Sequence, residues 1–192
     1  MSRLLIITSS TRPGRTGAVV TPWVADLARR HGAFDVEIAD LAEIGLPFLD
    51  EPDHPSEQNY RHQHTRDWSA VVDAADAFVI VTAEYNRGIT APLKNALDYL
   101  DSEWHAKPVG FVSYGMSSAG LRAVEMATQV VTALKMVPLC EVVPLPLRQV
   151  LDEQGRFTPL PHLAEGVRRL LDELERYAEV LRPLRVAALS SC

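Results

Sequence analysis

Short apolar runs alternate with longer amphipathic segments along most of the chain. Five runs have the length of strands, and those that start at Leu4 and Ala77 are continuously apolar, as expected for strands covered on both faces. The predicted strands are Leu4–Thr8, Phe34–Ala39, Ala77–Thr82, Val109–Ser113 and Leu139–Val143. Apolar residues at helical spacing lie between and after them. The predicted helices span about Gly17–His31, Arg66–Asp73, Ala91–Leu100, Gly120–Met136 and Leu163–Leu181.

Alternating strands and helices predict an α/β fold with a parallel sheet that carries helices on both faces. Ligands of such sheets bind beyond the carboxyl ends of the strands, where the strand order reverses. The loops after the first, third and fourth strands are therefore the candidates for function. Positions 41–66 contain three prolines among polar residues, which predicts a long loop.

Composition places the chain among ordinary globular proteins and excludes several classes. It has 192 residues, of which 47% are hydrophobic and 23% charged, so we expect one domain, residues 1–192. A net charge of −6 and the lack of a basic run argue against binding of nucleic acid. The apolar stretch Leu4–Ile7 is too short for a signal peptide or a membrane span. Two cysteines, Cys140 and Cys192, suit a reducing compartment, and we expect a cytoplasmic protein.

The loop after the first strand, SSTRPGRTG from Ser9 to Gly17, has the chemistry of an anion site. It offers four hydroxyls, two guanidiniums and two glycines between a strand and a helix N-terminus. Unpaired amides and the helix dipole favour an anion there, and Arg12 or Arg15 can add a charge-assisted bond. The loop matches neither the P-loop nor the dinucleotide fingerprint. A plain Ser/Thr helix cap with solvated arginines is the alternative.

Two further loops lie at the same predicted edge. The segment EYNRGIT from Glu84 to Thr90 offers the flat face of Tyr85 and turn-forming residues, which suits a planar heterocycle. The segment SYGMSSAG from Ser113 to Gly120 is a second small, hydroxyl-rich stretch. Taken alone, each segment more often indicates only an ordinary turn.

Together the three segments resemble the NAD(P)H-dependent FMN reductases of the flavodoxin-like fold, a family that includes quinone and azo-dye reductases. The resemblance covers roughly Arg3 to Leu145, and its most specific part is Tyr-Asn followed by Pro-x-Leu-Lys-Asn-Ala. It implies a flavodoxin-like three-layer sandwich with a five-stranded parallel sheet of order 2-1-3-4-5. It also implies FMN as cofactor, NADPH or NADH as co-substrate, and a homodimer or a dimer of dimers.

The resemblance also assigns residues to the cofactor. The residues implied for the FMN phosphate are Ser9, Thr11, Arg12, Arg15, Thr16 and Gly17. Those implied to line the ring are Glu84, Tyr85, Asn86 and Arg87, with Ser113, Tyr114 and Gly115 completing the pocket. Arg15 and Arg87 are also candidates for the extra phosphate of NADPH. Arg87 stands where many relatives have a small or aromatic residue, and Ala83 where the family often has proline.

Hydride transfer is the chemistry of the flavin itself, so we expect no catalytic side chain. The acceptor is expected to be a small molecule such as free flavin, a quinone or an azo compound. A flavodoxin-type electron carrier is the main alternative, and a redox-responsive partner protein is another. The histidines His54, His62 and His64 suggest a metal site only weakly, because no cysteine or HExxH helix accompanies them; a solvated edge or a lid is favoured.

Overall fold

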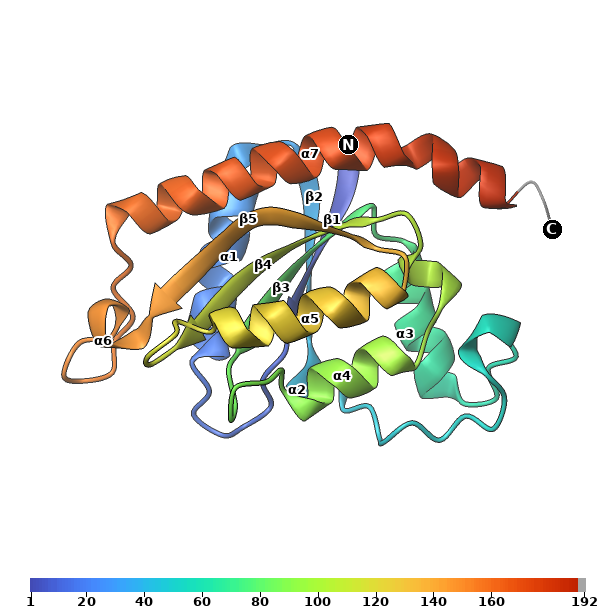
Figure 1. The fold of residues 1–192 in the computed structure, drawn as a ribbon, viewed down its shortest axis with the longest axis horizontal. Coiled ribbons are helices and arrows are strands. Elements are labelled where there is room, and N and C mark those ends of the chain that lie inside the picture. Colours follow the sequence, from blue (N-terminus) through green and yellow to red (C-terminus); the bar gives the residue numbers. More distant parts are fainter. Residues whose placement is uncertain (190–192) are drawn as a thin grey trace.

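The computed structural model describes residues 1–189, which form a parallel sheet between two layers of helices (Figure 1). The sheet has the order β2-β1-β3-β4-β5. Its strands are β1 (Ser2–Thr8), β2 (Phe34–Asp40), β3 (Ala77–Ala83), β4 (Pro108–Gly115) and β5 (Val137–Pro146). The order confirms the flavodoxin-like arrangement predicted from the sequence.

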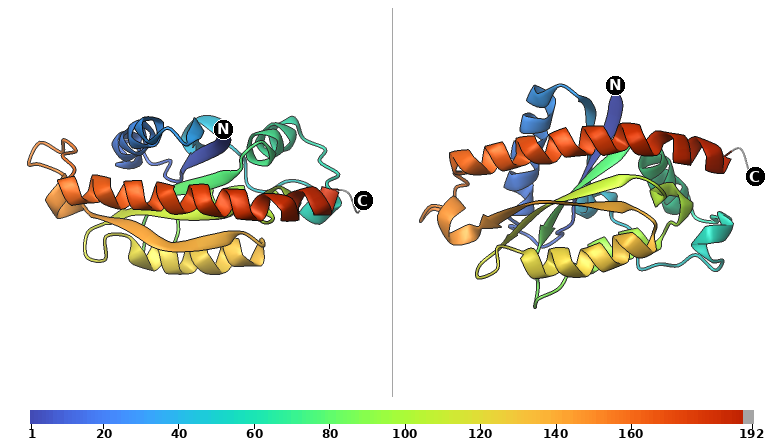
Figure 2. Two further views of the ribbon diagram at one scale, coloured as in Figure 1. Left: turned by 90° about the horizontal axis from the view of Figure 1, so that it is seen from above. Right: turned by 45° about the horizontal axis from the view of Figure 1, so that its top comes forward.

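Two helices cover one face of the sheet and three cover the other (Figures 1 and 2). The first pair is α1 (Gly17–His31) and α7 (Pro161–Leu189), and the opposite three are α3 (Gln63–Asp73), α4 (Ala91–Asp98) and α5 (Leu121–Ala133). The short elements are α2 (Leu41–Ile44), α6 (Leu147–Val150) and the 3-10 turns η1 (Pro55–Glu57) and η2 (Ser102–Trp104). No helix within residues 1–189 is both long and apolar enough to cross a bilayer.

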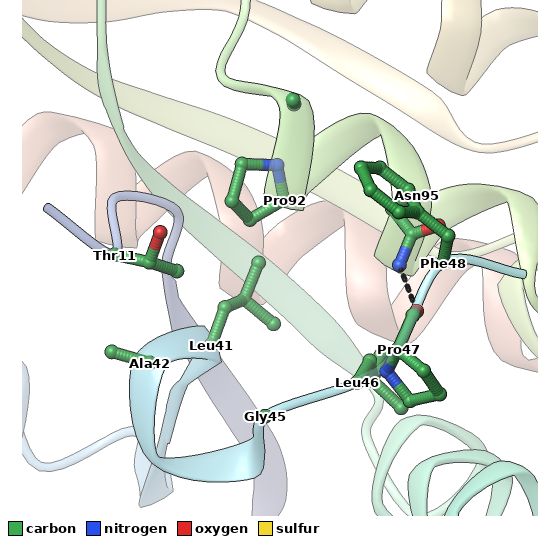
Figure 3. Close-up of a pocket in the computed structure, with 10 residues that line it drawn as sticks. Thr11, Leu41, Ala42, Gly45, Leu46, Pro47, Phe48, Pro92 and Asn95 are labelled. Carbon is green, nitrogen blue, oxygen red and sulfur yellow. Dashed lines mark hydrogen bonds between the residues drawn. The ribbon is translucent and has the colours of Figure 1, made fainter.

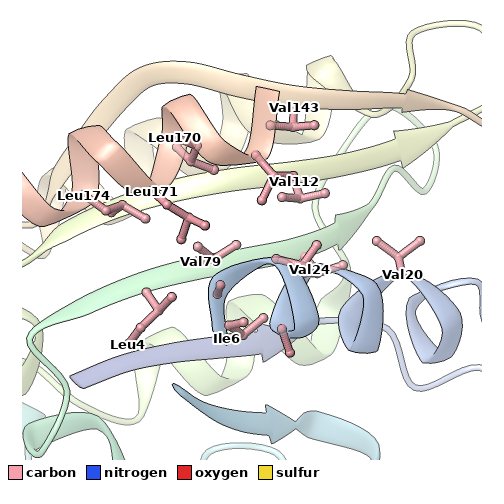
Figure 4. Packing of buried hydrophobic residues seen from close by; sticks show 14 of the residues in the cluster. Leu4, Ile6, Val20, Val24, Val79, Val112, Val143, Leu170, Leu171 and Leu174 are labelled. Atoms are coloured by element: carbon pink, nitrogen blue, oxygen red, sulfur yellow. The ribbon is translucent and has the colours of Figure 1, made fainter. Parts of the chain in front are cut away.

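Alternation along the strands divides the core between the two faces. Leu4 and Ile6 of β1 pack under α1 and α7 together with Val79 of β3 (Figure 4). Leu5 and Ile7 point to the opposite face, where α3, α4 and α5 cover them. Because successive strand residues face opposite ways, a strand covered on both sides must be apolar throughout. This requirement explains the continuous apolar runs of the sequence.

All five predicted strands and the five long predicted helices are present, and α1 ends at Gly32 with a φ of 81°, as a C-terminal glycine predicts. The prediction of an uninterrupted loop over 41–66 is wrong in part. Helix α2 and the turn η1 lie within it, and α3 already begins at Gln63. Asp40 starts α2, because its carboxylate accepts a hydrogen bond from the amide of Ala42 at 3.0 Å.

Candidate functional site

Three loops converge at the carboxyl edge of the sheet. Strand β1 pairs with β3 so that Thr8 lies beside Val81, and β3 pairs with β4 so that Thr82 lies beside Ser113. The loops that follow β1, β3 and β4 therefore start at nearly the same level. This edge is where open α/β sheets bind their ligands, and it brings the three segments singled out in the sequence together.

Ser9 joins the first of these loops to the second from inside the protein. Its hydroxyl donates to Thr82 Oγ1 at 3.1 Å, and its amide donates to the carbonyl of Val81 at 3.0 Å. Thr90 Oγ1 donates to the carbonyl of Ser9 at 2.8 Å. Ser9, Thr82 and Thr90 are all fully buried. The Ser9 hydroxyl therefore points to the neighbouring strand β3. Together with the bond from Thr90, it links the loop after β1 to the loop after β3.

Tyr114 reaches from β4 to the loop after β1. Its hydroxyl lies 2.8 Å from Ser10 Oγ, and both side chains are buried. A Cβ on Gly17 would stand 2.7 Å from Ser10 Oγ and 3.0 Å from the Tyr114 hydroxyl, so a side chain at the first residue of α1 would displace the contact between Ser10 and Tyr114. Burial raises the pKa of Tyr114, which keeps the hydroxyl protonated. Sequence reasoning missed Ser10, because nothing in the run SST marks which hydroxyl turns inward.

The backbone of the loop that leads into α1 has unused donors, whereas the amides of Ala18 and Val19 in the first turn of the helix are bonded to the carbonyls of Arg15 and Thr16. The amides of Ser10, Thr11, Arg12 and Thr16 find no acceptor within residues 1–189. Thr16 occupies the N-cap position, but its side chain makes no capping hydrogen bond. Free amides at a helix N-terminus form an anion-binding site, and Gly17 brings the backbone close without a side chain in the way. This donor set fits a phosphate group.

The two arginines of this loop have different surroundings. Arg15 Nη2 lies 2.5 Å from Asp40 Oδ2, at the carboxyl end of β2, and its Nε is buried with no hydrogen-bond partner among residues 1–189. Arg12 is exposed and makes no ion pair within the described residues. Arg12 is therefore free to meet an anion at the loop, whereas Arg15 is already committed to a carboxylate.

The loop after β3 starts with a tight two-residue turn. Tyr85 and Gly88 exchange both backbone hydrogen bonds, at 3.1 and 3.0 Å. The residues between them, Asn86 and Arg87, have φ values of 51° and 70°. Positive φ at both central positions defines a type I′ turn, which prefers Asn followed by Gly. Arg87 thus occupies a position where glycine is favoured, and Tyr85 keeps 40% of its surface exposed beside it.

Glu84 connects the end of β3 to the start of α5. Its carboxylate accepts hydrogen bonds from Ser118 Oγ, from the amide of Arg122 at 3.1 Å and from Arg122 Nη1 at 3.2 Å. Burial raises the pKa of Glu84, but the hydrogen bonds from Ser118 and Arg122 outweigh this effect and leave the pKa below its usual value. Glu84, which was predicted to line the ring, thus uses its ionised carboxylate to hold the loop after β4 in place. Ser118 and Arg122 were not singled out from the sequence.

The loop after β4 is closed by its own residues. Ser113 Oγ donates to the carbonyl of Ala119 at 2.9 Å, and both residues are buried. A Cβ on Gly115 would lie 2.9 Å from the amide of Gly120, and Gly120 itself has a φ of 90°. These contacts give the loop one compact shape, and they occupy the Ser113 hydroxyl that was expected to line a pocket.

A cavity of about 430 Å³ lies beside the loop after β1 (Figure 3). In Figure 3, Thr11 stands on one side and Phe48 on the other, with Leu41 and Pro92 between them. The lining residues are Thr11, Leu41, Ala42, Gly45, Leu46, Pro47, Phe48, Ala91, Pro92 and Asn95. Sequence reasoning missed this cavity, although the apolar stretch from Leu46 to Leu49 in a polar loop is a signal that points to it.

Asn95 holds the far wall of this cavity in place. Its Oδ1 accepts a hydrogen bond from the amide of Leu49 at 3.0 Å, and its Nδ2 donates one to the carbonyl of Pro47 at 2.7 Å. Tyr99 also donates to the Pro47 carbonyl, at 3.1 Å. A helix-start Asn usually makes local hydrogen bonds, but Asn95 bonds to residues 46 and 48 positions earlier in the chain.

Two of the three histidines singled out in the sequence contact each other at the start of α3. His62 and His64 stack with 5.2 Å between ring centres, and His64 Nε2 lies 3.0 Å from Asp50 Oδ1. Within the described residues, no three His, Cys, Asp or Glu side chains gather as they would around a metal ion. The histidine pair is instead part of a network that fixes the loop to α4 through Tyr99.

Comparison with known proteins gives a consistent result. A family model described as NADPH-dependent FMN reductase matches residues 2–148. A NAD(P)H-dependent FMN reductase of Schizosaccharomyces pombe is 37% identical over 171 residues, which cover 85% of this chain and 84% of the relative. An NADPH azoreductase of Bacillus sp. is 29% identical over 188 residues, covering 96% of this chain and 99% of the relative.

A solved structure shares the fold of this chain. A flavoenzyme NAD(P)H:(acceptor) oxidoreductase from Paracoccus denitrificans superposes with a TM-score of 0.71 at 18% identity, covering 93% of this chain and 98% of that one. At this level of identity, the likeness establishes the shared fold.

Proposed function

Because the chain belongs to the NADPH-dependent FMN reductase family, we propose that FMN binds at the carboxyl edge of its sheet and passes electrons from NADPH or NADH to a small acceptor. The observation that carries the proposed site is the set of free amides in the loop that leads into α1, next to Gly17, where a side chain would crowd Ser10 and Tyr114. A dianionic phosphate matches these donors. Family membership also favours an enzyme over a flavodoxin-type carrier.

The proposed phosphate contacts are the free donors of the first loop. Thr11 and Thr16 supply hydroxyls and amides, Arg12 supplies an unpaired guanidinium, and Gly17 allows close approach. Ser9 supports these donors from beneath rather than by contact, because its hydroxyl is bonded to a neighbouring strand. Arg15 contributes through its buried Nε, which is without a partner.

The proposed ring contacts belong to the type I′ turn. Tyr85 offers an exposed aromatic face, and Asn86 and Arg87 present polar groups at the tip of the turn. The rest of the predicted set frames this side of the pocket: Glu84, Ser113, Tyr114 and Gly115. We assign these four to positioning. Glu84 and Tyr114 already bond to other loops, whereas Ser113 bonds to Ala119 and Gly115 packs against Gly120 within the loop after β4.

When bound, FMN supplies the hydride chemistry, and the protein supplies binding and orientation. The rigid turn and the closed loop after β4 fix the walls of the pocket before any ligand arrives, so little ordering accompanies binding. Glu84 stays ionised at neutral pH and keeps the loop closed. No side chain is required as an acid, a base or a nucleophile in this scheme.

The test is the visible spectrum of the purified protein. We expect a yellow protein, or uptake of added FMN with a dissociation constant in the micromolar range or below, and bleaching when NADPH is added without oxygen. Gly17→Ala should bind FMN more weakly than wild type. A colourless protein that takes up no added FMN would refute the proposal, and binding without bleaching by either nicotinamide would leave a carrier instead of a reductase.

We also propose one domain over residues 1–192, a homodimer or a dimer of dimers, and a cytoplasmic location. Exposed apolar side chains around α5, among them Leu121 and Met126, support a contact between copies near the flavin site. The exposed free thiol of Cys140 suits a reducing compartment, while Cys192 lies outside the described residues. Sedimentation velocity of the purified protein tests the assembly, and a monomer at micromolar concentration would refute it.

A further inference from the structure

A second cavity, of about 490 Å³, lies between α1 and α7, which share one face of the sheet (Figures 1 and 2). We call it the α1–α7 cavity. The lining residues are Leu27, Arg30 and His31 of α1, and Pro161, Ala164, Glu165, Arg168 and Leu171 of α7. The volume lies in the range of small-molecule sites. None of these residues belongs to the three loops of the proposed flavin site.

The α1–α7 cavity is also remote from that site in space. Helix α1 begins at Gly17, beside the loop proposed to hold the phosphate, and reaches the cavity only with Leu27–His31. At a rise of 1.5 Å per residue, this last part lies roughly 15–20 Å along the helix from Gly17. It approaches the opposite edge of the sheet, because Phe34 pairs with Ser2 at the amino end of β1. The two sites can therefore be occupied at the same time.

The floor of the cavity is apolar and its rim is charged. Leu171 is buried in the core of this face, and Leu27 packs against the same core. The two arginines of the lining are exposed over more than half of their side chains. His31 is held in place by Asp172, whose Oδ1 lies 3.1 Å from its Nε2. This combination fits a molecule with an apolar body and one charged end.

The carboxylates that balance the two arginines lie mostly outside the lining. Asp26 pairs with Arg30 at 2.7 Å, and Asp172 Oδ2 accepts from Arg168 Nη1 at 2.6 Å, but neither carboxylate lines the cavity. Glu165 does line it and pairs with Arg168 Nη2 at 2.7 Å. Two guanidiniums in the lining therefore face one carboxylate, which leaves one positive charge for a monoanion. Exposed ion pairs are weak, so an incoming anion can share or displace them.

We propose that the α1–α7 cavity binds a small amphiphilic anion, namely a monocarboxylate with a short apolar chain. The carboxylate of the ligand pairs with Arg168 and Arg30, since a guanidinium donates two parallel hydrogen bonds to a carboxylate. The apolar chain lies on Leu27 and Leu171. The inference goes beyond the proposed function and does not depend on it, because no residue of the flavin site takes part.

The experiment is a titration of the isotope-labelled full chain, with FMN added, followed by amide shifts in two-dimensional NMR. The probes are octanoate, 1-octanol and octylammonium, which share one chain and differ in charge. Octanoate should bind with a Kd on the order of 1 mM or below, as about ten non-hydrogen atoms allow, and should shift the amides of Arg30 and of residues 164–168. Octanol should bind at least about fivefold more weakly, because it gains no charge-assisted hydrogen bond, and octylammonium more weakly still.

Four variants separate the charge of the site from the charge of the protein. Arg168→Gln should weaken octanoate binding about three- to tenfold. Arg169→Gln is the matched control, because Arg169 is exposed, lies outside the lining and carries the same charge; the affinity should change less than about twofold. Glu165→Gln should tighten binding about two- to fivefold, since it removes the competing carboxylate. Ala164→Phe fills the cavity and should abolish binding. All four should keep the FMN affinity of wild type.

Equal affinities for octanoate and octanol would overturn the proposal. An equal loss in Arg168→Gln and Arg169→Gln would also overturn it, because such a loss reports only the net charge of the protein. Shifts confined to the cavity between α2 and α4 would place the ligand elsewhere and have the same consequence. Should Arg168→Gln fail to fold, as circular dichroism would reveal, Glu165→Gln tests the same charge in the opposite direction. A wild type that takes up no FMN would refute the proposed function, while the octanoate titration decides this site independently.

Discussion

Glu84 links the end of β3 to the loop after β4 by hydrogen bonds. The substitution Glu84→Gln tests how much these bonds contribute to the stability of the fold. The carboxylate accepts from Ser118 Oγ and twice from Arg122. Glutamine has the same shape, but it carries no charge and has a single acceptor oxygen. It also turns an amide N–H toward groups that are themselves donors. The substitution therefore removes the charge and leaves at least one donor without a partner.

The magnitude follows from the exposure of each contact. A hydrogen bond to a charged group contributes about 1.5–3 kcal/mol. The contact to the Arg122 guanidinium is worth less, about 0–1 kcal/mol, because 41% of that side chain is exposed and water screens it. Since glutamine keeps one acceptor, we expect a loss of about 2 kcal/mol in the free energy of unfolding. For a chain of this size, that loss lowers Tm by about 4–8 °C.

The effect should depend on pH with a defined sign. The pKa of Glu84 in the folded protein lies below the ordinary value of 4.5. The charge therefore stabilises the fold at pH values above about 4.5, and this contribution disappears as the pH falls through the lower folded pKa. The difference in Tm between wild type and Glu84→Gln should be full at pH 7 and should shrink at acidic pH.

Thermal unfolding followed by circular dichroism, on flavin-free protein at pH 7 and at pH 4 or below, measures both effects. Glu165→Gln is the matched control, because Glu165 pairs with Arg168 on an exposed face of α7; its Tm should stay within about 1 °C of wild type. The FMN affinity of Glu84→Gln should also fall, because the loop after β4 loses its clamp. An unchanged Tm at pH 7, or a difference that grows in acid, would refute this account of Glu84.

Three further changes test other parts of the structure. Gly17→Ala places a methyl group 2.7 Å from Ser10 Oγ, so we expect a loss of about 1–3 kcal/mol in stability and a weaker FMN complex in a fluorescence titration. Arg87→Gly relieves a φ of 70° and should raise Tm by about 1–3 °C; a fall in Tm would contradict the turn assignment. Burial lowers the pKa of Lys107 to about 8, so Lys107 loses its proton in the folded state before it does in the unfolded chain. Stability in urea should therefore rise between pH 8 and 9.5 in wild type relative to Lys107→Met.

The strands of the sheet could be predicted from the sequence, because a strand buried on both faces has to be apolar at every position. Two such runs are Leu4–Thr8 and Ala77–Thr82, which are buried along their whole length. The short helices could not be predicted. Helix α2, for example, spans only four residues, which is too short to show the helical spacing of apolar positions. Strand β5 extends to Pro146, three residues beyond the predicted end. Proline within it is tolerated because β5 lies at the edge of the sheet.

At the site, the segments were predictable, but the direction of each side chain was not. Hydroxyls in SSTRPGRTG indicate an anion site as a group, yet Ser9 and Ser10 turn inward and Thr11 does not. That choice depends on Thr82 and Tyr114, which are distant in sequence. The same holds for Glu84, whose partners come from α5 and the loop before it. Composition of a loop predicts its chemistry, whereas its partners emerge only from the tertiary structure.

The hydrogen bonds that Ser9 and Ser10 make to neighbouring segments separate the scaffold from the surface that meets a ligand. Thr11 and Arg12 take no part in that scaffold through their side chains, so exchanging them leaves the frame intact. Such an arrangement lets the preference for cofactor or substrate drift over evolutionary time at little cost in folding. It also makes these outer positions the natural starting points for laboratory redesign of specificity.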